Sequence, residues 1–331
     1  NEYCLYIGIP FCPTRCLYCS FTSYPIGVYK DKVDAYLDTM EKEMEYVAAS
    51  YTEKKLVSIY IGGGTPSSIS AEQMDRLCSM IEKHFDLSQV REYTIEAGRP
   101  DSTTADKLQV MKAHGVGRIS INPQTMNGET LKLIGRAHTP EQAEEAFKRA
   151  REAGFDNINM DLIVGLPGED AEMVKRTLEK VKKLAPESLT VHTLAIKRAA
   201  HLKQEMDKYS FAGDVDEQLS LVGQAAEELG LAPYYLYRQK NMAGNLENVG
   251  YARHGLECLY NILIMEERTD IIGIGAGSSS KLIRREGDSD PVTGEMITGT
   301  RIDRVENCKS VDDYIARIDE MIDRKKQAFA K

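Results

Sequence analysis

Short apolar runs alternate with longer amphipathic stretches over the first 195 residues. The apolar runs predict strands at 3–9, 57–61, 93–96, 118–121, 157–164 and 189–193. The stretches between them predict helices at 32–50, 70–84, 104–114, 139–153 and 171–184. Two of these helices begin with capping boxes, Ser70 with Gln73 and Thr139 with Gln142, in which side chains satisfy the free backbone groups of the first turn. The pattern therefore consists of about six strand–helix units.

These units predict the fold class. Strands that alternate with helices form a parallel sheet with right-handed crossovers. About six units with short loops suit either a doubly wound sheet or an incomplete barrel, and the pattern alone leaves both open. In both folds the chemistry lies at the carboxyl ends of the strands, where polar residues of this chain also fall.

The pattern changes after residue 197, where we expect a domain boundary. Helices are predicted at 214–229 and 311–329, and strands at 234–237, 262–265 and 270–274. The turn-rich segment 284–300 predicts a hairpin or surface loop. We expect residues 1–197 to form a partial barrel and residues 198–331 a smaller α+β region that covers its mouth. Because the chain starts inside its first predicted strand and without Met, we expect a further segment to precede it.

Composition and charge narrow the class of protein. The hydrophobic fraction is 42% and the charged fraction 28%, as in ordinary globular chains. The 42 Lys and Arg residues against 51 Asp and Glu residues give a net charge of −9, which argues against general binding to nucleic acid or anionic membranes. No apolar run approaches the roughly 18–20 residues of a membrane span, and the start has no signal-peptide pattern. We expect a monomeric, cytoplasmic protein.

Four of the seven cysteines fall within the first nineteen residues. Cys12, Cys16 and Cys19 have the spacing Cys-x3-Cys-x2-Cys on the loop after the first predicted strand. An odd number of unevenly spaced cysteines is a poor disulfide framework, and in a reducing cytosol such a cluster favours metal binding or catalysis. Since simple iron–sulfur clusters use four cysteines, three would leave one iron of a four-iron cluster open to a ligand. A zinc site with a distant fourth ligand and a set of free thiols are the alternatives.

The cysteine spacing, with Tyr18 before the last cysteine, resembles the signature of the radical S-adenosylmethionine (SAM) superfamily. The segment Gly62-Gly63-Gly64-Thr65-Pro66 is similar to the superfamily's glycine-rich motif. Five further segments resemble the oxygen-independent coproporphyrinogen III oxidase group: IGIPFC, TIEAGRPDS, RISINPQTM, IGRAHTP and DLIVGLPGE. Two others, YYLYRQKNMAGNLENVGYA and IIGIGAGSSSK, look most like its HemZ-type branch. The resemblance implies an α/β fold, an incomplete (β/α)6 radical SAM barrel with a smaller C-terminal α+β extension.

The resemblance also implies a [4Fe–4S] cluster ligated by Cys12, Cys16 and Cys19, with SAM chelating the fourth iron. Residues implied to approach or bind SAM are Tyr6, Tyr18, Gly63, Gly64, Thr65, Glu96, Gln124, Arg136, Asp161 and Ala195. Among them, Glu96 would accept from the SAM amine and Arg136 would pair with the SAM carboxylate. Gln124 and Asp161 would hold the ribose. Ser279 would meet a second SAM or the substrate.

Several of these residues have an alternative interpretation. Arg136 is otherwise a surface charge beside a helix, and the segment around Ser279 is otherwise a turn capped by hydroxyl groups. Glu96 and Asp161 follow apolar strands, where burial of an unpaired carboxylate is costly, so each needs a partner, of which a ligand is one kind. The histidines at 114, 138 and 192 are interpreted as structural.

The resemblance implies an oxidoreductase that converts coproporphyrinogen III to protoporphyrinogen IX without oxygen. An electron from the cluster would cleave SAM, the resulting 5′-deoxyadenosyl radical would remove hydrogen from a propionate, and loss of CO2 and an electron would leave a vinyl group. A low-potential electron donor is implied. The tetracarboxylate substrate would need local cations, for which the candidates are Lys197, Arg198, Arg238 and Lys240, with solvated surface cations as the alternative.

Two other functions remain open. Phe21 stands where the dehydrogenases often have a further cysteine, as in chaperone-type and HemZ-type members. A haem chaperone of the HemW type would keep the cluster and deliver haem to other proteins. Another radical SAM enzyme would methylate a tetrapyrrole or open its ring.

Overall fold

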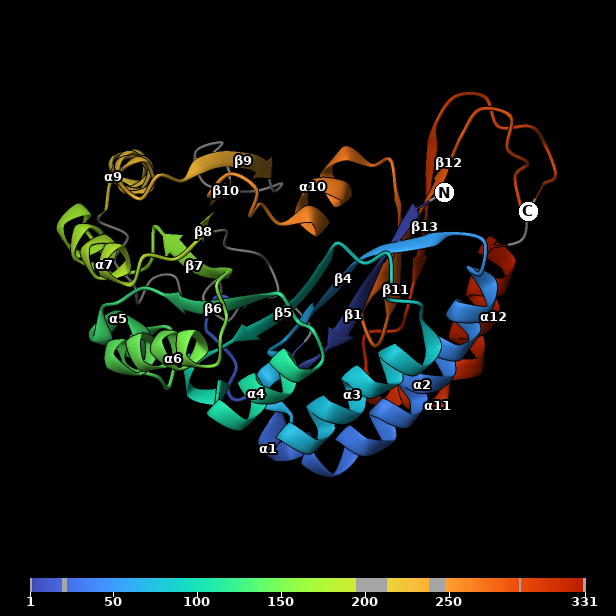
Figure 1. The fold of residues 1–331 in the computed structure, drawn as a ribbon, viewed down its shortest axis with the longest axis horizontal. Helices are drawn as coiled ribbons and strands as arrows, with labels where there is room; N and C mark the ends of the chain where they lie inside the picture. The colour runs from blue at the N-terminus through green and yellow to red at the C-terminus, as the bar shows by residue number, and fades with distance from the viewer. Residues whose placement is uncertain (1, 20–22, 195–212, 238–247, 292, 330–331) are drawn as a thin grey trace.

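In the computed structural model, residues 2–19, 23–194, 213–237, 248–291 and 293–329 are described. They form an 11-stranded sheet with most of the helices packed along one face (Figure 1). At its centre lie six adjacent parallel strands: β1 (Glu2–Ile9), β4 (Lys55–Gly63), β5 (Glu92–Gly98), β6 (Arg118–Gln124), β7 (Ile158–Val164) and β8 (Ser188–Thr193). These are the strands that the apolar runs predict.

The predicted helices between these strands are also present. They are α2 (Val33–Ser50), α3 (Ala71–His84), α4 (Ala105–Ala113), α6 (Pro140–Glu152) and α7 (Ala171–Leu184). Both predicted capping boxes are formed, by Ser70 with Gln73 and by Thr139 with Gln142. Shorter elements fill the loops: β2 (Phe11–Cys12), β3 (Tyr24–Pro25), α1 (Ile26–Tyr29), α5 (Gly128–Leu133), and the 3-10 turns Lys30–Lys32, Pro66–Ser68 and Pro100–Ser102.

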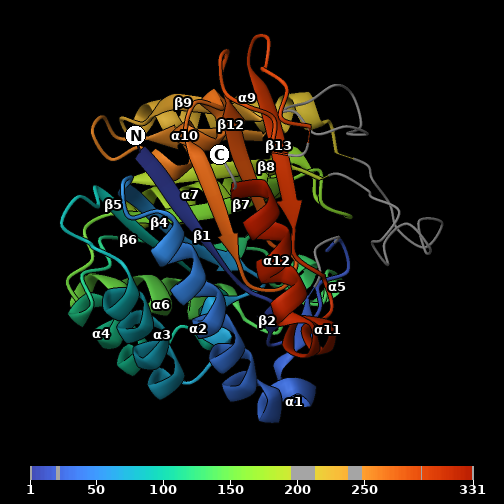
Figure 2. The ribbon, with the colours of Figure 1, turned by 90° about the vertical axis from the view of Figure 1, so that its right-hand side faces the viewer.

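The strands that follow residue 213 extend both edges of this sheet. On one edge β11 (Asp270–Ile274) pairs in parallel with β1, and β12 (Ser279–Arg284) and β13 (Arg301–Glu306) continue antiparallel (Figure 2). On the other edge β10 (Asn248–Ala252) runs antiparallel to β8, with β9 (Ala232–Tyr237) outermost. The two parts on either side of residue 197 therefore share one sheet, and the domain boundary stays a prediction.

Three segments of the C-terminal part differ from the expected elements. The strand predicted at 262–265 is wrong, because these residues lie in helix α10 (Leu259–Glu266). A short apolar run does not distinguish strand from helix, and the Glu92 carboxylate fixes the helix by accepting from the Leu259 backbone N–H at 2.6 Å. Strand β10 was not predicted. The predicted terminal helix divides into α11 (Val311–Ala316) and α12 (Ile318–Phe329).

The other C-terminal predictions are confirmed, and the strands predicted at 234–237 and 270–274 are β9 and β11. Helix α9 (Val215–Glu228) begins one residue after its Asp214 cap, within the predicted range. Segment 284–300 joins β12 to β13 as a hairpin, with a further bridge between Ser289 and Met296. Among the described helices, none is long and apolar enough to span a bilayer.

Alternation along the central strands gives the sheet two different faces. On β6, Ile119 and Ile121 are fully buried in the main core with the helices, whereas Arg118 and Asn122 line a cavity on the opposite face. The face with the cavity, called the inner face below, carries polar side chains on several adjacent strands. These side chains form the candidate site.

Candidate active site

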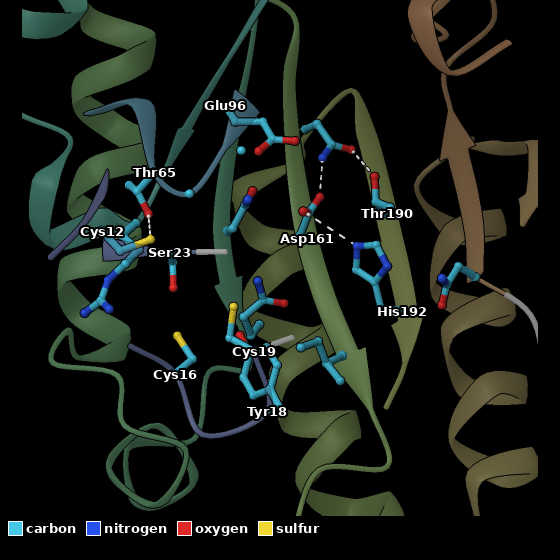
Figure 3. A pocket seen from close by; sticks show the side chains of 18 of the residues that line it. Cys12, Cys16, Tyr18, Cys19, Ser23, Thr65, Glu96, Asp161, Thr190 and His192 are labelled. Atoms are coloured by element: carbon cyan, nitrogen blue, oxygen red, sulfur yellow. Dashed lines mark hydrogen bonds and ion pairs between the residues drawn. The ribbon is translucent and has the colours of Figure 1, made fainter. Parts of the chain in front are cut away.

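A cavity of about 400 Å³ runs along the inner face of the central strands (Figure 3). Strands β1 and β4 to β8 and the cysteine loop all contribute to its wall. The sequence-predicted residues that line it are Tyr6, Cys12, Cys16, Tyr18, Cys19, Gly63, Gly64, Thr65, Glu96, Gln124, Arg136 and Asp161. The fold thus brings into one cavity residues that span more than 150 positions of the chain.

The cysteine loop is held in place by the segment that follows α5. The Thr14 hydroxyl donates to the Gly135 carbonyl at 3.1 Å, and the Leu17 N–H donates to the Ile134 carbonyl at 2.9 Å. Burial raises the pKa of Cys12 to about 11, although a contact from the Thr65 hydroxyl lowers it. The Cys12 thiol is therefore protonated at neutral pH, and a metal or another cationic group beside it would favour the thiolate.

Arg99 is a site residue that sequence reasoning missed. It is 2% exposed and forms two hydrogen bonds with Asp101, of 3.0 and 2.9 Å. Its remaining nitrogen donates to the Thr14 hydroxyl at 2.5 Å and to the Thr14 carbonyl at 3.2 Å. Arg99 therefore fixes the backbone of the cysteine loop from the end of β5.

The glycines after β4 let two chain segments pass very close to each other. A Cβ at Gly64 would lie 2.7 Å from the Phe11 carbonyl oxygen and 3.0 Å from Cys12 Sγ. Gly63 has a φ of +112°, which side-chain-bearing residues rarely adopt. The Gly64 N–H donates to the Ile9 carbonyl at 2.8 Å. These glycines are thus already needed to pack β4 against the cysteine loop.

Glu96 extends from β5 into the cavity (Figure 3). The Tyr60 hydroxyl donates to its carboxylate. Burial raises the pKa of Glu96 to about 7; the Tyr60 hydrogen bond lowers it and the charge of Asp161 raises it. No ion pair to Glu96 is formed by the described residues. A ligand with a cationic group would therefore stabilise the ionised carboxylate.

Asp161 belongs to a polar network across β7 and β8 (Figure 3). Asn159 Nδ2 donates to Asp161 Oδ1 at 2.6 Å, and the Thr190 hydroxyl donates to Asn159 Oδ1 at 3.0 Å. His192 Nε2 lies 3.7 Å from Asp161 Oδ2 and lines the cavity. The His192 ring thus faces the cavity beside a carboxylate, and its structural role stays a prediction.

Arg136 is buried, at 8% exposure, so its interpretation as a surface charge is wrong. Its guanidinium donates to the Asn122 carbonyl at 2.6 Å and to the Tyr18 hydroxyl at 3.2 Å, and both contacts orient it. The Arg136 Nε and the Gln124 Oε1 are buried and have no hydrogen-bond partner. Such atoms are rare in folded proteins, so they favour a polar ligand in this part of the cavity.

The donor chemistry fits a [4Fe–4S] cluster and SAM. Three thiols, on one loop, face the same cavity as a carboxylate suited to an amine and a guanidinium suited to a carboxylate. In the described part of the chain, no group of three or more Cys, His, Asp or Glu residues is arranged as a metal site. The three thiols thus share the cavity without forming a compact ligand set.

The other predicted site residues lie elsewhere. Ser279 is on β12, where its hydroxyl donates to Glu306 at 2.6 Å, and it does not line the cavity. Ala195, Lys197, Arg198, Arg238 and Lys240 lie outside the described residues. Cavity residues that sequence reasoning missed include Tyr60, Arg118, Asn122, Asn159, Thr190, Tyr235, Asn248 and Asn261. The period-two recurrence of polar residues within strands was the available signal for Arg118 and Asn122.

Comparisons with known proteins identify the family of the chain. The family model of the radical SAM superfamily matches residues 6–181. The chain is 48% identical over 291 residues to the oxygen-independent coproporphyrinogen-III oxidase-like protein HemZ of Bacillus subtilis, covering 86% of this chain and 58% of that protein. It is 33% identical to the haem chaperone HemW of the same organism, covering 82% of this chain and 69% of HemW.

A solved structure supports the fold. Coproporphyrinogen III oxidase (HemN) from Escherichia coli, a radical SAM enzyme, superposes with a TM-score of 0.74 at 23% identity, covering 97% of this chain and 70% of that chain. The likeness, at this identity, concerns the fold, and it confirms the predicted α/β radical SAM architecture. The present chain spans 58% of the length of HemZ.

Proposed function

Since the chain belongs to the radical SAM superfamily, whose domain implies a [4Fe–4S] cluster and SAM, we propose that it catalyses the oxygen-independent oxidative decarboxylation of coproporphyrinogen III to protoporphyrinogen IX. The observation that carries the proposal is the 48% identity to the coproporphyrinogen-III oxidase-like protein HemZ over 86% of the chain. A cytoplasmic setting and a low-potential electron donor belong to the same proposal.

The cavity residues have defined roles in this proposal. Cys12, Cys16 and Cys19 would hold the cluster, and Glu96 and Arg136 would bind the amine and the carboxylate of SAM. When bound, the two cofactors supply a carbon radical that removes a hydrogen atom from the substrate. Gln124 and Asp161 would bind the ribose hydroxyls.

The chain itself orients these groups before they bind. Arg99 holds the cysteine loop through Thr14, and Asn122 and Tyr18 hold the Arg136 guanidinium. Burial raises the pKa of Glu96 to about 7, so part of the carboxyl group is protonated at neutral pH. A cationic amine beside Glu96 would lower this pKa, and those protonated carboxyl groups would release their proton when the amine binds. Such preorganisation reduces the entropy lost on binding.

The substrate contacts are proposed without structural description. Lys197, Arg198, Arg238 and Lys240 would meet the propionates, and all four lie outside the described residues. Charge reversal at Arg198 tests this part: the affinity for coproporphyrin should fall, and an unchanged affinity would remove Arg198 from the site.

The decisive experiment is an anaerobic assay of the reconstituted protein. Dithionite, SAM and coproporphyrinogen III are added, and protoporphyrinogen IX, methionine and 5′-deoxyadenosine are quantified. We expect all three products from the wild-type chain and from Cys308→Ser, a cysteine away from the cavity, and none from Cys16→Ser. Because the chain spans 58% of HemZ, a longer chain with flanking residues is assayed in parallel.

A haem chaperone function is the second candidate, and the 33% identity to HemW over 82% of the chain favours it. The same preparation distinguishes the two functions. Tight stoichiometric haem binding without protoporphyrinogen formation in either chain would support the chaperone and overturn the decarboxylase.

The second SAM molecule predicted at Ser279 stays a prediction. Equilibrium dialysis with labelled SAM counts the bound molecules directly. Two molecules per chain, reduced to one by Ser279→Ala, would support it, whereas one molecule in both proteins would not.

A further inference from the structure

Arg118 lies at the opposite end of the cavity from the cysteines. It is the first residue of β6, whereas Gln124 is the last, and both line the same cavity. At the rise of a β-strand, six residues separate them by about 20 Å. The strand register sets Arg118 level with Tyr6 and two positions before the level of Glu96, so the cavity extends beyond Glu96 toward the start of the strands.

The Arg118 guanidinium is buried without a matching anion. The side chain is 2% exposed, and one terminal nitrogen donates to the Ser188 hydroxyl at 3.3 Å. Its Nε is buried and has no hydrogen-bond partner. Within the described ranges no carboxylate forms an ion pair with it. A buried charge in this state is costly unless it is paired.

Two carboxylates lie near enough to feel the Arg118 charge, Glu92 and Glu96, and neither forms an ion pair with it in the described part of the chain; the oxygens of Glu92 bind another group. They accept from the Leu259 N–H at 2.6 Å and the Tyr260 N–H at 3.2 Å, and thus cap helix α10. A contact from the Cys258 thiol at 3.4 Å completes this set. Glu92 therefore stabilises a helix terminus, and the Nε of Arg118 stays without a hydrogen-bond partner.

Tyrosine side chains surround Arg118 at this end of the cavity, which is called the floor of the cavity below. The positive charge of Arg118 acts on Tyr60, Tyr234 and Tyr235, whose pKa values burial raises and Arg118 lowers. Tyr60 and Tyr235 line the cavity, as does Asn261, which donates to the Tyr234 hydroxyl at 3.3 Å. A water molecule could bond to the Arg118 Nε but could not neutralise its charge.

We propose that Arg118 is the anchor of a carboxylate subsite on the floor of the cavity and that it binds one carboxylate of the substrate. A planar guanidinium whose Nε lacks a partner matches a carboxylate with two oxygens. This subsite rests on the proposed function, since a tetrapyrrole with propionate side chains is the substrate considered. It is separate from Arg136, which Asn122 and Tyr18 hold near the cysteine loop.

Binding measurements test this subsite independently of the catalysed reaction. The probes are coproporphyrin III, its uncharged tetramethyl ester, and SAM, each titrated anaerobically against reconstituted protein. We compare Arg118→Gln and Arg118→Lys with Arg91→Gln, a matched control at an exposed arginine that pairs with Glu2. Arg118→Gln should weaken coproporphyrin binding about tenfold or more, the size of a lost charge-assisted contact, and leave the ester and SAM within about twofold. Arg118→Lys should be intermediate, and Arg91→Gln unchanged.

Three outcomes would overturn the subsite. If Arg118→Gln weakens SAM and not coproporphyrin, the guanidinium serves the SAM carboxylate. If it weakens the acid and the ester equally, or neither, Arg118 has a structural role. If Arg118→Gln does not fold, the Tm of the wild-type protein is measured with propionate and with propionamide. Propionate should raise the Tm and propionamide should not. Equal shifts in Tm would refute the proposal. A wild-type protein that binds coproporphyrin through Arg118 without turnover would refute the proposed function and leave the subsite standing.

Discussion

Lys325 and Glu43 form a 2.7 Å ion pair in which neither side chain has any exposed surface. Lys325 lies on α12 and Glu43 on α2, so the pair joins elements 282 residues apart. Glu43 also accepts from Asn307 Nδ2 at 2.7 Å and from the Gly275 N–H at 2.9 Å. The glycine-rich segment after β11 is thus fixed from the C-terminal helix, next to the strand that leads into the cysteine loop.

Loss of the lysine should destabilise the whole chain. Lys325→Met leaves the Glu43 charge buried and without its cation, and breaking one partner of a buried pair costs about 3–5 kcal/mol. Urea unfolding measures the change in the free energy of unfolding. Lys326→Met is the control, because that lysine is exposed and pairs with exposed Asp323, and it should leave the urea midpoint nearly unchanged. Equal midpoints for the two variants would contradict this role of the pair.

SAM affinity should depend on pH through Glu96. A cationic amine prefers the ionised carboxylate, and the pKa of Glu96 is raised to about 7 by burial. Affinity should therefore rise by up to tenfold per pH unit below about pH 7 and level off above it. Anaerobic calorimetry between about pH 5.5 and 8.5 measures this slope. In Glu96→Gln the slope should disappear and the affinity at pH 8 should fall, whereas an unchanged slope would exclude Glu96 as its source.

Arg99 should control how well the cysteine loop accepts a cluster. Arg99→Lys keeps a positive charge but loses the two-point contact with Asp101 and the bonds to Thr14. We expect a loss of about 1–3 kcal/mol in the free energy of unfolding and fewer iron atoms per chain after reconstitution. Iron and sulfide analysis measures the occupancy. Arg91→Lys, at an exposed arginine, is the matched control, and equal iron content in both variants would refute the positioning role.

Local patterns predicted much of the fold because the decisive interactions lie within a few residues. The capping boxes at Ser70 and Thr139 depend on residues three positions apart and are formed as expected. The helix at Leu259 was mistaken for a strand, since its start is fixed by Glu92, more than 160 residues away. Local propensity carries no information on such a partner.

The candidate site likewise contains residues that local motifs identify and residues whose roles depend on distant parts of the chain. Motifs that are contiguous in sequence led to Cys12, Glu96 and Arg136, all of which line the cavity, while their roles stay predictions. Arg99 and Arg118 act through contacts with Thr14 and Ser188, which come from other parts of the chain. Only the assembled sheet reveals that these two arginines are buried.

Gly64 should tolerate no side chain, because the cysteine loop occupies the space that a Cβ needs. In Gly64→Ala the new atom would lie 2.7 Å from the Phe11 carbonyl oxygen and 2.9 Å from the Pro10 carbonyl carbon, so backbone must move. Overpacking of this kind costs about 1–3 kcal/mol. Since Cys12 Sγ lies 3.0 Å from the same position, the displaced loop should also bind less iron. Gly117→Ala is the control, because a Cβ there meets nothing within 4 Å. Urea unfolding and iron analysis of both variants check the prediction. A Gly64→Ala protein with normal stability and full iron content would contradict it, because the cysteine loop would then move without loss of stability or iron binding.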